Sequence, residues 1–396
     1  MMDLTPKQEI DSRIGSLQQL QQQQELTGTL IILNSDLFYF AGTVQNSYLY
    51  VPAQGEVVLM VKKSLHRAQQ ESTLKNIVGI KSPKEIPSIL AGFGYTNLGK
   101  IGMELDVLPF NLYKMYQGIF PGAQLCDISP TIKEIRGIKS PYEVEILRKA
   151  LFVADQAFQT VPKYLREGML EIELAALFEA ELRRRGYAGC CKMRAFNQEF
   201  FFGDVCSGAS GFIPSFFDGP IGGSGVCVSH PNGAGWKKIS RNEPVLIDYT
   251  SIIQGYTGDQ TRMFCIGELS PAMEKAFEAS LLIEKEVLKV MKPGTAMEEP
   301  YLLALKLAAE MGYKDNFMGY KEDRAKFLGH GIGLELDEWP IFAKGFKQPL
   351  LPGMTFALEP KFVFSEGAIG TENSFVMTEA GPELLSMTPE IITYVK

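Results

Sequence analysis

The last third of the chain contains four acidic residues and one histidine in segments that are otherwise apolar and strand-like. The segments are VLIDYTSIIQGYTGDQTRMF, FLGHGIGLELDEWP and FALEPKFVFSEGAIGTENSF, and the five residues are Asp248, Asp259, His330, Glu359 and Glu372. A carboxylate buried in an apolar strand is strongly destabilising unless a partner compensates its charge. One imidazole and four carboxylates can hold two divalent cations if two of the carboxylates bridge.

The first of these segments is predicted to be a β-hairpin. VLIDYT and QTRMFCI form its two strands, and Gly255 and Gly258 lie near the turn. Asp248 and Asp259 are then on opposite strands, where β-structure disfavours aspartate unless it has a partner. Two aspartates at strand ends or in turns would give the same pattern without a cation, so this segment alone leaves both interpretations open.

His330 is one of three histidines in the chain and stands between two glycines. Glycine on both sides lets another backbone approach closely and leaves the imidazole accessible to a ligand. Most single histidines are ordinary core or surface residues, so the metal hypothesis for His330 depends on the acids around it. Glu359 and Glu372 each stand in an apolar strand, where a shared pair of dications would compensate their charges.

Composition and charge narrow the class of protein. The net charge is −7, which argues against nucleic-acid or anionic-membrane partners, because both attract basic patches. Residues 1–25 are polar, and no stretch approaches the ~20 apolar residues of a membrane span. The cysteines show no CxxC spacing, which favours reduced thiols and a cytoplasmic protein. They are Cys126, Cys190, Cys191, Cys206, Cys227 and Cys265.

The length of 396 residues favours two domains. The first part of the chain alternates strand-like and helical segments, which indicates a complete α/β domain. Its predicted strands include Thr29–Leu33, Leu37–Phe40, Tyr48–Val51 and Val57–Val61, and its predicted helices include Lys7–Gln24 and Asn111–Ile119. The boundary is predicted within Ile128–Ser140, which gives domains at 1–135 and 136–396.

The second domain is predicted to begin with a long amphipathic helix. Ser140 is its expected N-cap, Pro141 its first residue, and Glu143 completes a capping box. Further helices are predicted at Leu170–Arg185, Pro271–Met291 and Met297–Met311, with strands towards the C-terminus.

These residues and their spacing resemble the pita-bread metallopeptidases, the group of aminopeptidase P, prolidase, creatinase and methionine aminopeptidase. The family's two aspartate ligands lie eleven residues apart, as Asp248 and Asp259 do, and a Thr-Arg pair follows the second. Its histidine ligand lies in an H-G-x-G motif, and its two glutamates lie in an E-P strand and a later strand. The chain matches all of these features at His330, Glu359 and Glu372.

The resemblance covers the whole chain and implies an α/β (α+β) fold. SDLFYFAGTVQNSYLYVP resembles part of a creatinase-type N-terminal domain, and IRGIKSPYEVEILRKA resembles the start of the catalytic domain in aminopeptidase P and prolidase. We therefore expect a creatinase-like N-terminal α/β domain followed by a C-terminal pita-bread catalytic domain. Relatives with this N-terminal domain commonly pair through it, so a homodimer is expected.

The resemblance also implies two divalent metal ions per chain, either Mn²⁺, Co²⁺ or Zn²⁺. Asp259 and Glu372 would bridge both ions, Asp248 would complete one site, and His330 with Glu359 would complete the other. A metal-bridging hydroxide would attack the scissile carbonyl, and Glu359 would act on the water proton.

The chain departs from the family pattern at two positions. The family has a substrate-contacting histidine seven residues after the ligand histidine, where this chain has Asp337. An ionised aspartate cannot donate a hydrogen bond and repels a carboxylate, so substrate binding at that point must differ. The family's proton-shuttling histidine lies seventeen residues before the first aspartate ligand, whereas His230 lies eighteen before Asp248. His230 is either that shuttle or an ordinary loop histidine.

The function that the resemblance implies is metal-dependent hydrolysis of Xaa-Pro peptide bonds, as an aminopeptidase or a dipeptidase acting on small peptides. The alternative is a pita-bread enzyme that acts on a non-peptide small molecule, such as a creatinase-like or ectoine-type C–N hydrolase or a sulfonium propionate lyase. Asp337 favours this alternative, because an acid could face a cationic substrate. A non-catalytic binding protein is the third hypothesis, and the complete set of five ligand residues argues against it.

Overall fold

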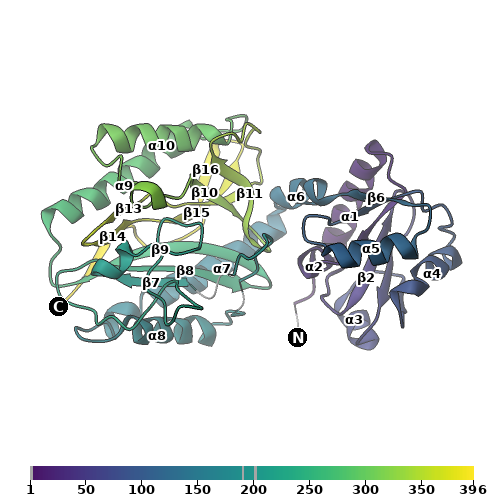
Figure 1. Cartoon of the computed structure of the whole chain (residues 1–396), viewed down its shortest axis with the longest axis horizontal. Helices are drawn as coiled ribbons and strands as arrows, with labels where there is room; N and C mark the ends of the chain where they lie inside the picture. The colour runs from purple at the N-terminus through teal and green to yellow at the C-terminus, as the bar shows by residue number, and fades with distance from the viewer. Residues whose placement is uncertain (1–2, 190, 200–202) are drawn as a thin grey trace. The chain divides into compact units, whose positions relative to one another are not determined.

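The computed structural model describes residues 3–189, 191–199 and 203–396, so Cys190 lies outside the described residues. The chain divides into two compact units, one that ends at Arg136 and one that begins at Gly137 (Figure 1). The other five cysteines are free thiols. Among the described residues, no helix combines the length and the apolar character that a membrane span requires.

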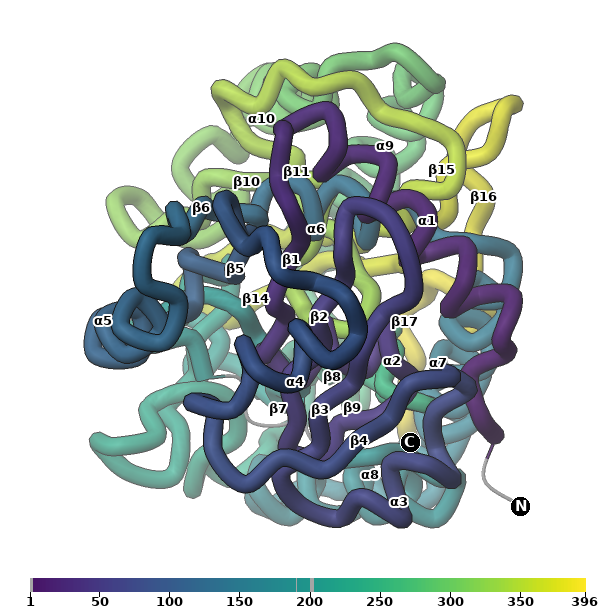
Figure 2. Tube along the Cα trace, turned by 90° about the vertical axis from the view of Figure 1, so that its right-hand side faces the viewer, coloured from purple at the N-terminus to yellow at the C-terminus, as the bar shows by residue number. Residues whose placement is uncertain are grey.

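The N-terminal unit contains a six-stranded mixed sheet in the order β4-β3-β2-β1-β5-β6. Its strands belong to the purple and blue part of the trace in Figure 2. Strands β1, β2 and β3 pair antiparallel, and the other pairs are parallel. The strands are β1 Gly28–Ile31, β2 Ser47–Pro52, β3 Val58–Val61, β4 Ile77–Gly79, β5 Lys100–Met103 and β6 Gln124–Asp127. The helices are α1 Lys7–Gln23, α2 Asn34–Ala41, α3 Leu65–Glu71, α4 Ile86–Gly92, α5 Phe110–Ile119 and α6 Ser129–Gly137, with a 3₁₀ turn at Pro83–Glu85.

The strand predicted at Leu37–Phe40 is wrong, because these residues belong to helix α2. Their aromatic side chains favour strands in isolation. Gly42 instead ends a helix in the left-handed conformation, with φ of 70°, and its N–H donates to the Phe38 carbonyl at 2.9 Å. The buried face of the helix then packs in the core of the unit.

The C-terminal unit contains two larger sheets and a hairpin. Their orders are β17-β9-β8-β7, β11-β10-β12-β15-β16 and β13-β14. The strands are β7 Gly203–Ser207, β8 Val245–Ile253, β9 Tyr256–Ile266, β10 Phe327–Ile332, β11 Leu336–Ala343, β12 Thr355–Leu358, β13 Lys361–Phe364, β14 Gly367–Gly370, β15 Asn373–Thr378, β16 Gly381–Leu384 and β17 Ile392–Val395. The helices are α7 Pro141–Phe158, α8 Glu171–Arg184, α9 Pro271–Val290 and α10 Glu298–Glu310, with 3₁₀ turns at Val161–Lys163, Gly208–Phe212 and Lys321–Asp323.

Helices cover both sides of this unit. Figure 1 shows α7 and α8 on one side of the sheets and α9 and α10 on the other. Phe158 and Phe178 pack with Tyr249 of β8 on the first side, and Phe356 packs with Phe375 on the second. Each large apolar side chain buried in this way contributes roughly 1.5–3 kcal/mol, so both cores stabilise the strands that lie between them.

The start of α7 confirms the predicted capping box. The Glu143 N–H donates to the Ser140 hydroxyl at 3.2 Å, and the Ser140 N–H donates to the Glu143 carboxylate at 3.0 Å. Further along α7, Leu151 lies so close to Gly258 of β9 that a Cβ there would be 2.7 Å from the Leu151 Cγ. Gly258 therefore serves helix packing inside the strand, and the hairpin turn lies at Gln254–Gly255.

Candidate metal centre

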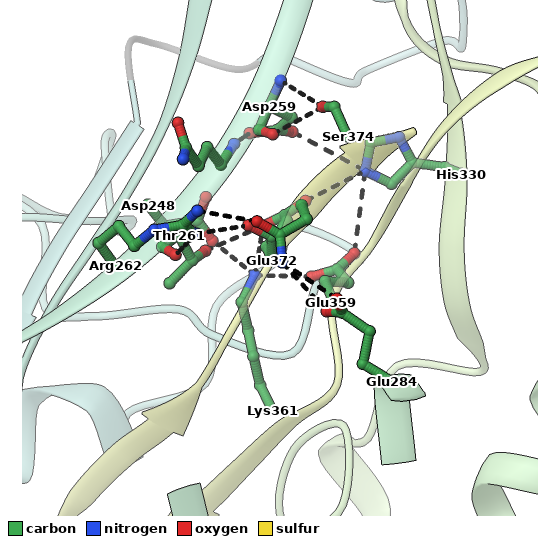
Figure 3. Close-up of polar contacts among 12 residues, drawn as sticks. Asp248, Asp259, Thr261, Arg262, Glu284, His330, Glu359, Lys361, Glu372 and Ser374 are labelled. Atoms are coloured by element: carbon green, nitrogen blue, oxygen red, sulfur yellow. Dashed lines mark hydrogen bonds and ion pairs between the residues drawn. The ribbon is translucent and has the colours of Figure 1, made fainter. Parts of the chain in front are cut away.

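Five side chains that are far apart in the sequence converge in the C-terminal unit (Figure 3). Asp248 comes from β8 and Asp259 from β9, His330 from β10, and Glu359 and Glu372 flank the β13–β14 hairpin. The last four are buried, and Asp248 is partly buried. The five candidate ligands of the sequence analysis are therefore brought together.

The hairpin register explains the eleven-residue spacing of the two aspartates. Asp248 pairs with Thr261, and Asp259 pairs with Thr250. Residues two apart on a strand share a face, and directly paired residues also share one. Both carboxylates therefore lie on the same face of the hairpin. An isolated bridge between Thr261 and Glu372, with an N···O distance of 3.3 Å, joins this face to the second sheet.

The glycines beside His330 allow the close backbone contacts that the sequence predicts. A Cβ at Gly329 would lie 2.1 Å from the Ala357 carbonyl oxygen, and a Cβ at Gly331 would lie 2.3 Å from the Trp339 carbonyl carbon. These atoms belong to the backbones of neighbouring strands and cannot rotate away. Strand β10 therefore fits between β11 and β12 only with glycine at both positions, and this fit aims the imidazole.

We expect Gly331→Ala to destabilise the protein by about 1–3 kcal/mol, because overpacking pushes β11 away from β10. The displaced imidazole should also lower the affinity for Mn²⁺ roughly 10-fold. Thermal unfolding and Mn²⁺ titration measure the two effects. Gly118→Ala is the control, since a Cβ there has no neighbour within 4 Å. Unchanged stability and affinity in Gly331→Ala would contradict this account.

The His330 ring faces a space that three carboxylates surround. Its Nε2 lies 3.9 Å from Asp259 Oδ2, 3.8 Å from Glu359 Oε1 and 3.9 Å from Glu372 Oε1. These distances are too long for hydrogen bonds. Asp259, His330 and Glu372 each offer one ligand atom, and these three atoms all lie within 4.8 Å of one another. That is close to the limit of roughly 4.2 Å for two atoms that each lie ~2.1 Å from one cation.

The electrostatics of the cluster also call for a cation. Burial, reinforced by the charge of Glu372, raises the pKa of Asp259 well above its usual range, and raises that of Asp248 to about 6. Burial raises the pKa of Glu359 as well. Each shift means that the ionised form is unfavourable in the protein alone. A bound cation reverses this preference, so the donor set fits a divalent metal.

The second ring nitrogen of His330 has partners of its own. Its Nδ1 lies 3.2 Å from the Gly331 carbonyl oxygen and 3.5 Å from Asp337 Oδ1. Burial lowers the pKa of the imidazole, but the charges of Asp337 and Glu359 outweigh it and raise the pKa. A neutral imidazole that donates from Nδ1 to such an acceptor leaves Nε2 free to coordinate, which is the usual arrangement of a metal-binding histidine.

Asp337 lies at the wall of the cavity above the cluster, with a third of its side chain exposed. Asp204 of β7, which the sequence analysis missed, also lines this cavity and pairs with Asp248 across the sheet. It accepts a hydrogen bond from Asn232 Nδ2 at 2.9 Å. The lining residues are Asp204, Phe217, Asp218, Gly219, Pro220, Ile221, Asp248, Asp259, Phe327, His330, Leu336, Asp337, Glu359 and Glu372.

His230 is exposed and is not among the residues that line this cavity. Its Nδ1 lies 3.1 Å from the Ser229 hydroxyl and 4.0 Å from the Cys227 sulfur. The convergence of the five candidate ligand residues therefore does not extend to His230.

The second residue that the sequence analysis missed is Lys361, which enters the cluster from the start of β13. Its Nζ donates to Asp248 Oδ2 at 2.7 Å, Glu359 Oε2 at 2.9 Å and Glu372 Oε2 at 2.7 Å (Figure 3). The sequence contains a pattern that could have predicted this position of Lys361. Lys361 interrupts an apolar strand two residues after Glu359, and residues two apart in a strand face the same way.

Outer contacts hold the candidate ligand residues in place. Arg262 Nη1 donates to the Glu372 carbonyl at 3.0 Å, and Thr261 Oγ1 donates to Glu372 Oε2 at 2.9 Å. The Ser374 hydroxyl accepts from the Asp259 N–H and donates to the Asp259 carbonyl. Such partners fix the orientation of ligand side chains.

Comparison with known proteins shows two family matches that together cover most of the chain. Residues 145–379 match metallopeptidase family M24, and residues 13–138 match the creatinase/prolidase N-terminal domain.

Individual relatives match over nearly the full length. The Xaa-Pro dipeptidase of Pyrococcus furiosus is 26% identical over 379 residues, which are 95% of this chain and 98% of that protein. The solved structure of the prolidase from Pyrococcus furiosus has a TM-score of 0.77 and 25% identity, covering 94% of this chain and 99% of that one. The Xaa-Pro dipeptidase from Bacillus anthracis has a TM-score of 0.83 and 22% identity, covering 98% and 100%, which shows a shared fold.

Proposed function

Because the chain belongs to metallopeptidase family M24, we propose that it hydrolyses the bond between an amino acid and proline in small peptides. The observation that carries this proposal is the convergence of four acids and one histidine at the base of a cavity. The full-length similarity to an Xaa-Pro dipeptidase and to a solved prolidase supports the substrate class. Aminopeptidase and dipeptidase activities are both consistent with it.

A divalent cation would be held by Asp259, His330 and Glu372, each of which offers one ligand atom within 4.8 Å of the others, and Glu359 lies beside them. When bound, it supplies a Lewis acid and lowers the pKa of water. Glu359 Oε1 faces the same space and is placed to accept a proton there. One imidazole among carboxylates suits Mn²⁺, Co²⁺ or Zn²⁺, and the ion remains a prediction.

The structure does not fit the prediction of two cations on the Asp248 side of the cluster. The second cation would lie between Asp248 and the bridging Glu372, and the Lys361 ammonium occupies that position. The residues on the His330 side fit a divalent ion, and those on the Asp248 side do not fit a second one.

We propose four further properties on the basis of the family resemblance. These are a proton-transfer role for His230, a functional division at residues 1–135 and 136–396, a homodimer and a cytoplasmic location. His230 is exposed, and its Nδ1 lies 3.1 Å from the Ser229 hydroxyl. A role in catalysis would require it to reach the substrate from outside the cavity wall.

A second candidate function is hydrolysis or cleavage of a small cationic molecule that is not a peptide. The observation that favours it is Asp337, which lines the cavity beside His330 with part of its carboxylate exposed. An acid at this position attracts a cationic group and repels the free carboxylate of a proline dipeptide. Assays of Xaa-Pro dipeptides, longer Xaa-Pro peptides and small cationic amides separate the two candidates.

For an Xaa-Pro peptidase, we expect Asp337→His to preserve or raise kcat/KM for a proline dipeptide. The new imidazole supplies a donor to the amide or carboxylate, an interaction of about 1–3 kcal/mol with a charged partner. For an enzyme of cationic substrates, the same change should weaken kcat/KM for the best cationic substrate by a comparable amount. Steady-state kinetics on both substrates give the answer.

The matched control is Asp218→His, because Asp218 lines the same cavity and is exposed. Equal effects of the two variants would indicate a general change of cavity charge. If neither substrate responds to Asp337→His, Asp337 does not contact the substrate.

A further inference from the structure

We propose that the ammonium of Lys361 takes the place of one of the two cations, so that the centre binds a single divalent ion per chain. The proposal rests on the metal centre of the proposed function and changes its composition. Four observations carry it: the contacts of Lys361, the way two glutamates divide their oxygens, the fixed position of the lysine, and the charge of the cluster.

Lys361 is bound in the way a small cation would be. It is fully buried, and its three hydrogen-bond acceptors lie at 2.7–2.9 Å and belong to three different carboxylates. An ammonium group has three N–H donors, so each donor has one carboxylate oxygen. All three partners belong to the five predicted metal ligands. The ammonium lies between Asp248 and the two glutamates (Figure 3).

Glu359 and Glu372 divide their oxygens between two positive positions. In both residues Oε2 accepts from Lys361, whereas Oε1 faces His330 Nε2 at 3.8–3.9 Å. Glu359 and Glu372 therefore each contact both positions, and one of these positions holds an ammonium. The two-cation prediction has Asp259 and Glu372 as the bridging pair, so the structure agrees with it at Glu372 only. On the other side Asp259, His330 and Glu372 each offer one ligand atom, all within 4.8 Å of one another.

The backbone of Lys361 is fixed from both sides. It pairs with Gly370, where a Cβ would lie 2.7 Å from the Lys361 Cα, and its carbonyl accepts from the Met318 N–H at 2.9 Å. A second cation bound to Asp248 and Glu372 would need the space that the ammonium fills. A cation placed beside the ammonium would be repelled strongly by it. The lysine side chain is surrounded by protein, so it has no room to move aside.

The charge of the cluster is compatible with a single dication. Asp248, Asp259, Glu359 and Glu372 bring four negative charges when ionised. One dication and the ammonium together bring three positive charges, and the side chains of all but Asp248 are almost completely buried. The lysine thus supplies, as part of the chain, a positive charge that otherwise requires a second metal ion.

The first test is the number of Mn²⁺ ions that the full-length protein binds after removal of metals by a chelator. Calorimetric titration should give one ion per chain, and electron paramagnetic resonance should show the six-line spectrum of an isolated Mn²⁺. Two ions per chain with a spin-coupled spectrum would overturn the proposal, and so would the absence of Mn²⁺ binding.

Two ligand variants sharpen the test. Asp248→Asn should keep one Mn²⁺ per chain with a loss of affinity no greater than roughly 10-fold, because Asp248 acts through Lys361. Asp259→Asn should lose more than roughly 100-fold in affinity, because it removes a direct ligand. A fall from two ions to one in Asp248→Asn, or equal losses in the two variants, would refute the proposal.

Lys361→Ala provides the converse experiment. Removing the ammonium opens the Asp248 side, so this variant should bind two Mn²⁺ ions per chain and develop a spin-coupled spectrum. Lys361→Met has a similar volume and no charge, and it should stay at one ion or fewer. Binding of one ion by both variants, with circular dichroism spectra like that of the unaltered protein, would count against the proposal.

The number of bound Mn²⁺ ions and the hydrolysis of Xaa-Pro peptides can be tested separately. One Mn²⁺ per chain without Xaa-Pro hydrolysis would refute the substrate class and leave the role of Lys361 standing. Two Mn²⁺ ions with Xaa-Pro hydrolysis would do the opposite.

Discussion

Glu372→Gln is expected to remove most of the bound metal and to abolish activity. Glu372 is buried, and its Oε1 faces the His330 side of the centre while its Oε2 accepts from Lys361 and Thr261. A glutamine amide has one oxygen, so its NH₂ group must point at the cation or at the ammonium. We expect the affinity for Mn²⁺ and kcat/KM each to fall roughly 100-fold or more.

The control for this variant is Glu366→Gln, which makes the same chemical change on the exposed β13–β14 turn. Glu366 accepts a hydrogen bond from the neighbouring Ser365 and has no part in the centre. Metal content by atomic emission and kinetics on a proline dipeptide should be unchanged in this control. A fully metallated and active Glu372→Gln protein would show that the centre is assigned wrongly.

Arg136→Met is expected to destabilise the N-terminal unit by about 3–5 kcal/mol. Arg136 Nη1 contacts Asp36 Oδ1 at 2.6 Å, and both side chains are buried. Glu104 is also buried, and burial together with the charge of Asp36 raises its pKa to about 8. Methionine keeps much of the volume of arginine but leaves Asp36 beside Glu104 without the compensating cation.

Hydrogen exchange of peptides from β1 and β5 reports the stability of this unit separately. A loss of 3–5 kcal/mol corresponds to roughly two to four orders of magnitude in protection. The control is Lys133→Met on the same helix, whose partner Asp106 is partly exposed, and it should cost less than about 1 kcal/mol. Equal protection in the two variants would mean that the buried pair does not stabilise the unit.

Much of the candidate centre could be predicted because a buried charge without a compensating partner is strongly destabilising. Acids in apolar strands are rare unless a partner exists, so Asp248, Asp259, Glu359 and Glu372 stood out without any structure. The same physical reasoning applies to local signals such as the capping box at Ser140, where the interacting groups are three residues apart. The family and the fold class drawn from these motifs are confirmed by the matches to family M24 and to the creatinase/prolidase N-terminal domain.

Other features depend on contacts between segments that are distant in the sequence. Leu37–Phe40 looks like a strand by composition, but it belongs to helix α2, which packs against α1 and β2. Asp204 joins the cavity only because β7 pairs with β8. His230 has the spacing of a catalytic histidine, yet the fold leaves it exposed.

The role of Lys361 is the clearest example of a feature that the sequence alone does not predict. A lysine in an apolar strand indicates a buried positive charge, but its partners lie 2, 11 and 113 residues away. Only the folded arrangement places its ammonium between Asp248 and two glutamates, at the position of the predicted second ion. Strand order and register decide which charges meet, because electrostatic interactions depend on distance in space and not on separation along the chain.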